Sequence, residues 1–176
     1  MDMMGYTHDI KRALARIARL QGDAVAEQKW RSMAQGVATL TTANLWRQEL
    51  GAMYDRDAVD TWVTTLVHNN LRMMWHGLFS QAMADTFVER HLMNKSEFWS
   101  TMPLPSIAIN DYRFHHNPKA GNDWSGAVEG LTTQRAVRAL ESYVGASRGS
   151  FHKGLQLFFI FNVDMRSILM VSVICV

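Results

Sequence analysis

The sequence predicts an all-α protein made of helical hairpins, with one long functional loop region inserted among them. Apolar residues recur with the period of an α-helix through most of residues 7–92. The composition then changes abruptly, because residues 98–143 hold all three prolines of the chain and two of its six tryptophans. A long loop inside a compact helical protein is uncommon and usually functional. We therefore expect the binding residues in this second region.

The first hairpin is predicted over residues 7–45. One apolar face of its first helix, residues 7–21, comprises Ile10, Ala13, Leu14, Ile17 and Ala18. Gly22 is expected to end this helix and Asp23 to cap the next one, residues 24–45. The apolar stripe of the second helix comprises Trp30, Met33, Val37 and Leu40. Two helices joined by so short a break pack antiparallel, and their arginines are expected to face solvent.

A second helical hairpin is predicted over residues 60–92, with Ser80 as an N-cap inside it. Before it, the run Asp55-Arg56-Asp57 could supply a catalytic acid pair, but it is more typical of a turn in which the arginine balances the acids. After it, residues 94–97 form a capping-box pattern. A last helix is expected over residues 131–143, after an irregular stretch from 101 to 126.

Composition and charge exclude several classes of protein. The 18 basic and 16 acidic residues form no basic stripe, so a nucleic-acid partner is not expected. The single cysteine, Cys175, excludes an intramolecular disulfide. The histidines His68, His76 and His91 match no metal-ligand spacing, and neither a metal nor another cofactor is expected. The N-terminus lacks the pattern of a signal peptide, which predicts a cytoplasmic protein.

The loop region has the composition of a carbohydrate site. A sugar ring presents apolar C–H faces and an equator of hydroxyl groups, so its sites combine aromatic platforms with amides, carboxylates and backbone groups. The candidate substrate-binding residues are Trp99, Asp111, Asn122, Asp123, Trp124 and Gly126. The alternative is that Trp99 and Trp124 merely fill the interior of the hairpins.

Several motifs in order resemble one family of glycosidases. Residues 54–57 (Tyr-Asp-Arg-Asp), a helix pair, residues 97–99 (Glu-Phe-Trp), 103–108 (Pro-Leu-Pro-Ser-Ile-Ala) and 122–126 (Asn-Asp-Trp-Ser-Gly) are similar to the catalytic barrel of trehalase-like glycosidases, in the clan of processing α-glucosidase. Within it they resemble the mannosylglycerate-hydrolase-like branch. The resemblance covers residues 10–143 and implies a partial (α/α)₆ toroid, a carbohydrate substrate and inverting hydrolysis of a glycosidic bond.

The departures from that family matter for function. Many relatives have Tyr-Trp-Arg-Gly-Pro-Val-Trp where residues 123–129 stand, so Ser125 and Glu129 replace a sugar-binding arginine and a second tryptophan. The resemblance also implies that the catalytic acid and base lie outside residues 1–143. The catalytic residues are therefore unknown, and Asp111, Asp123 and Glu129 are not assigned that role. The alternative function is a non-enzymatic helical remnant that binds a sugar or a partner.

The chain divides into a toroid domain over residues 1–143 and a divergent segment over 144–176. The latter begins as a Gly/Ser linker and continues in apolar runs that are interrupted by Asn162, Asp164 and Arg166. These polar residues argue against a membrane span, although attachment to a membrane through this tail stays an alternative. A toroid fragment should leave two apolar edges partly bare, one around Ile10 and one around Leu140. We expect these edges to be covered by the tail or to cause self-association.

Overall fold

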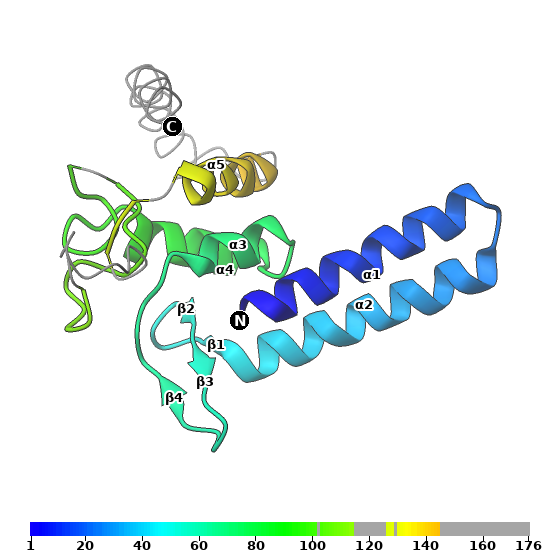
Figure 1. Cartoon of the computed structure of the whole chain (residues 1–176), viewed down its shortest axis with the longest axis horizontal. Helices are drawn as coiled ribbons and strands as arrows, with labels where there is room; N and C mark the ends of the chain where they lie inside the picture. The colour runs from blue at the N-terminus through cyan, green and yellow to red at the C-terminus, as the bar shows by residue number, and fades with distance from the viewer. Residues whose placement is uncertain (102, 115–125, 129, 145–176) are drawn as a thin grey trace, which may run out of the picture.

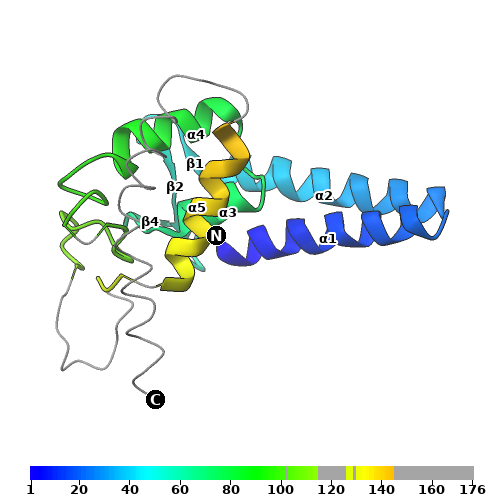
Figure 2. The same cartoon turned by 90° about the horizontal axis from the view of Figure 1, so that it is seen from above.

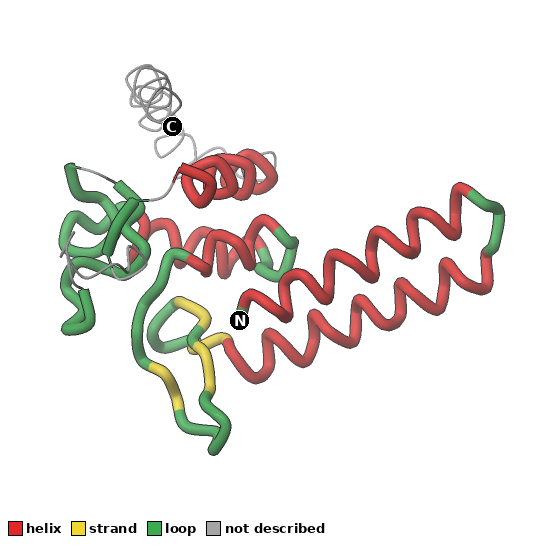
Figure 3. The backbone as a smooth tube through the Cα atoms, in the orientation of Figure 1, coloured by secondary structure: helices red, strands yellow, loops and turns green. Residues whose placement is uncertain are grey.

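The protein is mainly helical, as predicted. The computed structural model describes residues 1–101, 103–114, 126–128 and 130–144. Its elements, shown in Figures 1 and 3, are α1 (Asp2–Leu20), α2 (Ala24–Leu45), β1 (Trp46–Arg47), β2 (Ala52–Met53), β3 (Asp55–Arg56), β4 (Trp62–Val63), α3 (Asn69–Trp75), α4 (Gln81–Phe87), the π-helix η1 (Val88–Leu92) and α5 (Gly130–Val144).

Helices α1 and α2 form a long antiparallel hairpin that projects from the rest of the structure (Figures 1 and 2). The turn has the predicted chemistry, because Gly22 takes a φ of 75° and the Asp23 side chain accepts a 2.9 Å hydrogen bond from the Ala26 N–H. Small residues make the seam between the helices, with Ala15 and Ala34 buried. The first hairpin is confirmed.

The apolar faces of this hairpin are not buried as the periodicity alone would predict. Ile10 and Ile17 are 60% and 50% exposed, and Met33 and Leu40 are also exposed. The alanine seam brings α1 and α2 together on another side, so the larger apolar residues face away from it. The bare edge predicted around Ile10 is present, whereas Leu140 is buried and the edge predicted there is absent.

The second hairpin begins later than predicted. Trp62 and Val63 are not helical but pair antiparallel with Asp55–Arg56, and the guanidinium carbons of Arg47 and Arg56 lie 4.7 and 4.0 Å from the Trp62 ring centroid. These cation–π contacts favour the extended pairing over a helix. The predicted turn at 55–57 is also wrong, because Asp55 and Arg56 form a strand that pairs with Trp62 and Val63. The turn follows at Asp57, whose carboxylate accepts the N–H groups of Val59 and Thr61.

The core lies between the short helices and the loops. Its fully buried side chains include Met73, Met74, Phe87, Phe98 and Leu104. Helix α5 packs against α3, and the Tyr143 hydroxyl donates a 2.8 Å hydrogen bond to the Phe79 carbonyl. The Ser80 side chain caps α4 by accepting from the Met83 N–H, as predicted. The last helix is confirmed as well.

Among the described residues, none of the helices is both long enough and apolar enough to cross a membrane. Residues 145–176 lie outside the described residues, so the division of the chain at residue 144 stays a prediction.

Candidate functional site

Three backbone segments pair side by side at the end of the structure where the loops gather (Figure 1). Val67 bridges Ile107, and Pro105 bridges Val128, both in antiparallel fashion. The Ser106 N–H donates to the Ala127 carbonyl at 3.0 Å, and the Ser106 carbonyl accepts from the His68 N–H at 3.2 Å. We call this arrangement of residues 66–68, 105–108 and 126–128 the loop ladder. It fixes the Pro-Leu-Pro-Ser segment between two neighbours.

The central segment of the loop ladder enters it through a constrained backbone. Leu104, between two prolines, has a φ of 65° and a completely buried side chain. Such a conformation costs roughly 1–2 kcal/mol for a residue other than glycine, and it persists where the surroundings determine it. The Leu104 N–H donates to the Phe98 carbonyl at 2.9 Å, which secures the turn.

Gly126 is the first residue of the third segment of the loop ladder. Its φ of 150° lies where glycine is favoured, and its N–H donates to the Ser106 hydroxyl oxygen at 2.8 Å. The last residue of the Asn-Asp-Trp-Ser-Gly motif is thereby tied to the Pro-Leu-Pro-Ser motif.

The remaining predicted site residues divide into two groups. Trp99 is half-buried and packs against the core, and its N–H donates to the Asn94 carbonyl at 2.9 Å. The Asp111 carboxylate accepts the Arg113 N–H at 2.8 Å and so closes a local turn. Both residues therefore have structural roles. Asn122, Asp123 and Trp124 lie outside the described residues, and a role of any of the six in sugar binding stays a prediction.

His68, which sequence analysis considered only as a metal ligand, lies directly beside the loop ladder. Its side chain is 2% exposed, and its Nδ1 has no hydrogen-bond partner within the part of the chain that the structure describes. Burial, together with the nearby Arg72 cation, lowers the pKa of His68 from 6.5 to about 4. The imidazole is therefore neutral near pH 7. No spacing pattern in the sequence indicates this placement.

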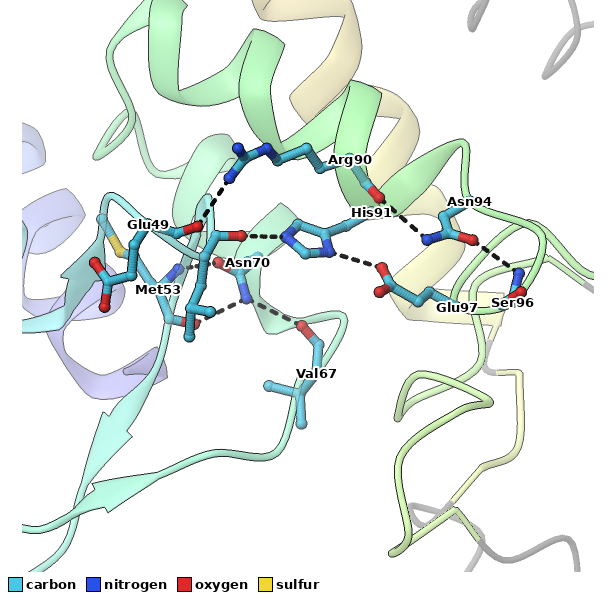
Figure 4. Close-up of polar contacts among 10 residues, drawn as sticks. Glu49, Met53, Val67, Asn70, Arg90, His91, Asn94, Ser96 and Glu97 are labelled. Carbon is cyan, nitrogen blue, oxygen red and sulfur yellow. Dashed lines mark hydrogen bonds and ion pairs between the residues drawn. The ribbon is translucent and has the colours of Figure 1, made fainter.

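Two side chains fasten the segment that carries residues 54–57 (Figure 4). The first is Asn70, whose amide oxygen accepts the Met53 N–H at 2.7 Å and whose amide nitrogen donates to the carbonyls of Met53 and Val67 at 3.1 and 3.2 Å. One fully buried amide thus joins β2 to the first segment of the loop ladder.

The second is His91 of η1, which bridges two loops in Figure 4. Its Nε2 lies 2.7 Å from the Leu50 carbonyl oxygen and its Nδ1 lies 2.7 Å from Glu97 Oε2. This contact also corrects the predicted capping box. The Glu97 carboxylate turns toward His91 rather than to the Asn94 N–H, and Asn94 Oδ1 instead accepts the Ser96 N–H at 2.9 Å. The result is a turn, not a helix.

The described part of the site is held together by backbone hydrogen bonds and by the buried side chains of Asn70 and His91. Within the described residues, no three His, Cys, Asp or Glu side chains gather as a metal ion would need. Burial raises the pKa of the Tyr54 hydroxyl, so this tyrosine beside the Asp-Arg-Asp run stays protonated at neutral pH.

Comparison with solved structures shows a shared fold. Neutral trehalase Nth1 from Saccharomyces cerevisiae superposes with a TM-score of 0.69 at 16% identity, covering 81% of this chain and 27% of that one. The GH63 mannosylglycerate hydrolase from Thermus thermophilus in complex with glucose gives 0.66 at 16% identity, covering 81% and 33%. A sialidase gives 0.73 at 14% identity, covering 88% and 15%. The chain thus spans a third or less of these relatives.

One family of proteins matches the sequence over a range that includes every described residue. No curated protein matches the chain. The profile of the mannosylglycerate hydrolase MGH1-like glycoside hydrolase domain matches residues 1–153. Together with the helical-hairpin fold and the motifs joined by the loop ladder, this match leads to one conclusion: the chain belongs to the MGH1-like glycoside hydrolase domain family.

Proposed function

We propose that this chain supplies the sugar-binding loop end of a glycoside hydrolase that cleaves, with inversion, a glycosidic bond in a small sugar or oligosaccharide. The observation that carries the proposal is the loop ladder. It joins two family motifs at Ser106, whose hydroxyl accepts the Gly126 N–H and whose N–H donates to the Ala127 carbonyl. Preorganised loops of this kind place polar groups and aromatic rings against a sugar.

We further propose that residues 1–176 bind a sugar but do not hydrolyse it by themselves. Inverting glycosidases need two carboxyl groups about 6.5–9.5 Å apart, one acting as acid and one as base. The chain spans 27% of the trehalase and 33% of the mannosylglycerate hydrolase, which supports placing at least one of these groups in the part that the relatives have in addition.

The test is a titration of the 176-residue chain with mannosylglycerate, trehalose and glucose, followed by intrinsic tryptophan fluorescence and by release of reducing sugar. We expect saturable binding without turnover. Replacing Trp124→Ala should weaken binding, whereas Trp30→Ala on α2 is the control and should leave it unchanged. If none of the sugars binds, the proposal of sugar binding is refuted, and if reducing sugar is released, the proposal that residues 1–176 do not hydrolyse it is refuted.

A non-enzymatic role in binding a sugar or a partner is the second candidate. It is favoured by the same short coverage of the relatives. It differs from the first in predicting no gain of hydrolysis when the chain is joined to the missing part of a relative's domain.

The bare apolar face of the α1–α2 hairpin supports a further proposal, that the chain associates with itself. We call the apolar face the side that carries Ile10, Ile17, Met33 and Leu40, all of them exposed. Because an apolar surface of two long helices is unfavourable in water, a second copy would bury it.

A further inference from the structure

A cavity opens between the two long helices, away from the loop ladder. It has a volume of about 920 Å³ and is lined by residues of α1 and α2 and by Gly77, which follows α3. Four arginines line it: Arg12, Arg16 and Arg19 from α1 and Arg31 from α2. We call this cavity the arginine groove.

The positive charge of the arginine groove is only partly balanced. Arg31 pairs with Glu27 at 2.7 Å, and Arg12 lies 3.9 Å from Asp9. Arg16 and Arg19 make no ion pair within the described residues. Four guanidinium groups against two carboxylates leave a net charge of +2 at this face, because 4 − 2 = 2.

The arginines of α1 are spaced so that their positive charges repel one another. Arg12, Arg16 and Arg19 stand at i, i+4 and i+7, so they form one stripe along α1. Like charges at such spacing repel one another and destabilise a helix. Arg31 adds a fourth like charge from the facing helix. An anion between the two helices would remove this repulsion.

The shape of the groove also suits a ligand. Ala15 and Ala34 are buried and belong to its lining, so small apolar side chains contribute to the groove together with the arginines. At the rim, Gly77 has a φ of 74°, and a Cβ added there would come within 3.2 Å of Arg12 Nη1. The volume lies in the range of small-molecule sites, which is about 300–1,000 Å³.

We propose that the arginine groove binds a small polyanion that carries two or more phosphate groups. A guanidinium group matches two phosphate oxygens with parallel N–H donors, which makes arginine the favoured residue for such recognition. Arginines on two facing helices require more than one anionic group to be engaged together. The site is separate from the sugar-binding loops and does not depend on their proposed function.

The test uses inorganic tripolyphosphate as the probe and isothermal titration calorimetry of the full 176-residue chain. We expect saturable binding that weakens as salt is added, because the contacts are ionic. The double variant Arg16→Gln/Arg19→Gln should lower the affinity at least about tenfold, since two guanidinium contacts to phosphate are lost. Circular dichroism checks that this variant keeps its helices.

The matched control is Lys29→Gln/Lys95→Gln, which removes the same charge from exposed positions outside the arginine groove. Its affinity should stay within about twofold of the wild type. An equal loss in the control would mean attraction by overall charge and would overturn the proposal. No binding of tripolyphosphate at millimolar concentration, or equal binding of monophosphate, would overturn it too.

Discussion

At the scale of single residues, His68 is a neutral imidazole enclosed beside the loop ladder. Its pKa of about 4 in the folded protein lies below the usual 6.5 because burial disfavours the charged form. A group whose folded pKa is lowered binds more protons in the unfolded chain between those two values. The contribution of His68 to stability is therefore complete above pH 6.5 and falls as the pH drops toward 4.

We predict that His68→Leu makes the protein less sensitive to acid. Between about pH 7 and pH 5 the wild type should lose roughly 2 kcal/mol more unfolding free energy than the variant, because each pH unit below 6.5 costs about 1.4 kcal/mol for this one group. Urea unfolding at the two pH values measures the difference. His8 and His76, whose pKa values are also lowered chiefly by burial, remain in both proteins and cancel. Equal acid sensitivity of the two proteins would contradict the prediction.

Ser106 holds the loop ladder through its hydroxyl group, which accepts the Gly126 N–H. We predict that Ser106→Ala costs about 1–3 kcal/mol, because a buried N–H loses its acceptor. Ser142→Ala removes an exposed hydroxyl that donates to the Ala139 carbonyl, and it should cost less than about 0.5 kcal/mol. The thermal unfolding midpoints of the two variants decide. Equal losses of stability in the two variants would contradict the prediction that the Ser106 hydroxyl stabilises the loop ladder.

At the scale of elements, His91 fastens the turn before β2 to the loop after η1. We predict that His91→Ala costs about 2–4 kcal/mol, since it leaves both the Leu50 carbonyl and the Glu97 carboxylate without this partner. The exposed Lys95→Ala is the control and should be nearly silent. Chemical denaturation measures both. If His91→Ala unfolds like the control, the two 2.7 Å contacts do not stabilise the fold.

The sequence predicts the helices whose signals are local. The Gly22-Asp23 break and the Ser80 cap act on neighbouring residues, and both are found where they were expected. Apolar spacing alone predicts a helix at Trp62 and Val63, because it cannot detect a partner strand or two arginines over an indole ring. Tertiary contacts override the local period there.

In the candidate site, too, some features can be predicted from the sequence and others depend on tertiary contacts. Two of the three segments of the loop ladder belong to motifs that are visible in the sequence, and Ser106 joins them through Gly126. The roles of Asn70 and His91 are not visible in the sequence, because their partners are distant. Asn70 contacts a residue 17 positions away and His91 contacts one 41 positions away. The predicted capping box failed for this reason: Glu97 has a more distant and better-placed partner in His91.

At the scale of the whole molecule, the apolar face of the α1–α2 hairpin is the surface through which we propose that the chain associates with itself. A stable dimer interface buries about 800 Å² on each partner. Two helices of 19 and 22 residues, each about 30 Å long and 10 Å wide, present a face of that order. The face is therefore large enough for self-association.

We predict a concentration-dependent dimer that Ile10→Glu/Ile17→Glu converts to a monomer, because buried unpaired charges are strongly unfavourable. Multi-angle light scattering after size-exclusion chromatography measures the mass. Val59→Glu/Tyr112→Glu is the control, since Val59 and Tyr112 are 79% and 74% exposed and yet lie outside the apolar face. A wild-type monomer at all concentrations would contradict the proposal of self-association.

The projecting α1–α2 hairpin should exchange its amide protons faster than the core does. It meets the rest of the structure near Gly5 and His8, where a Cβ on Gly5 would strike His76 and the His8 ring lies 2.8 Å from the His76 carbonyl. Amide protons near the Gly22 turn can therefore exchange with solvent through fraying of the hairpin tip alone. Those of Met73, Met74 and Phe87 need the whole core to open. Hydrogen exchange should separate the two by orders of magnitude, and a polyanion held between the helices would slow the first group without changing the second.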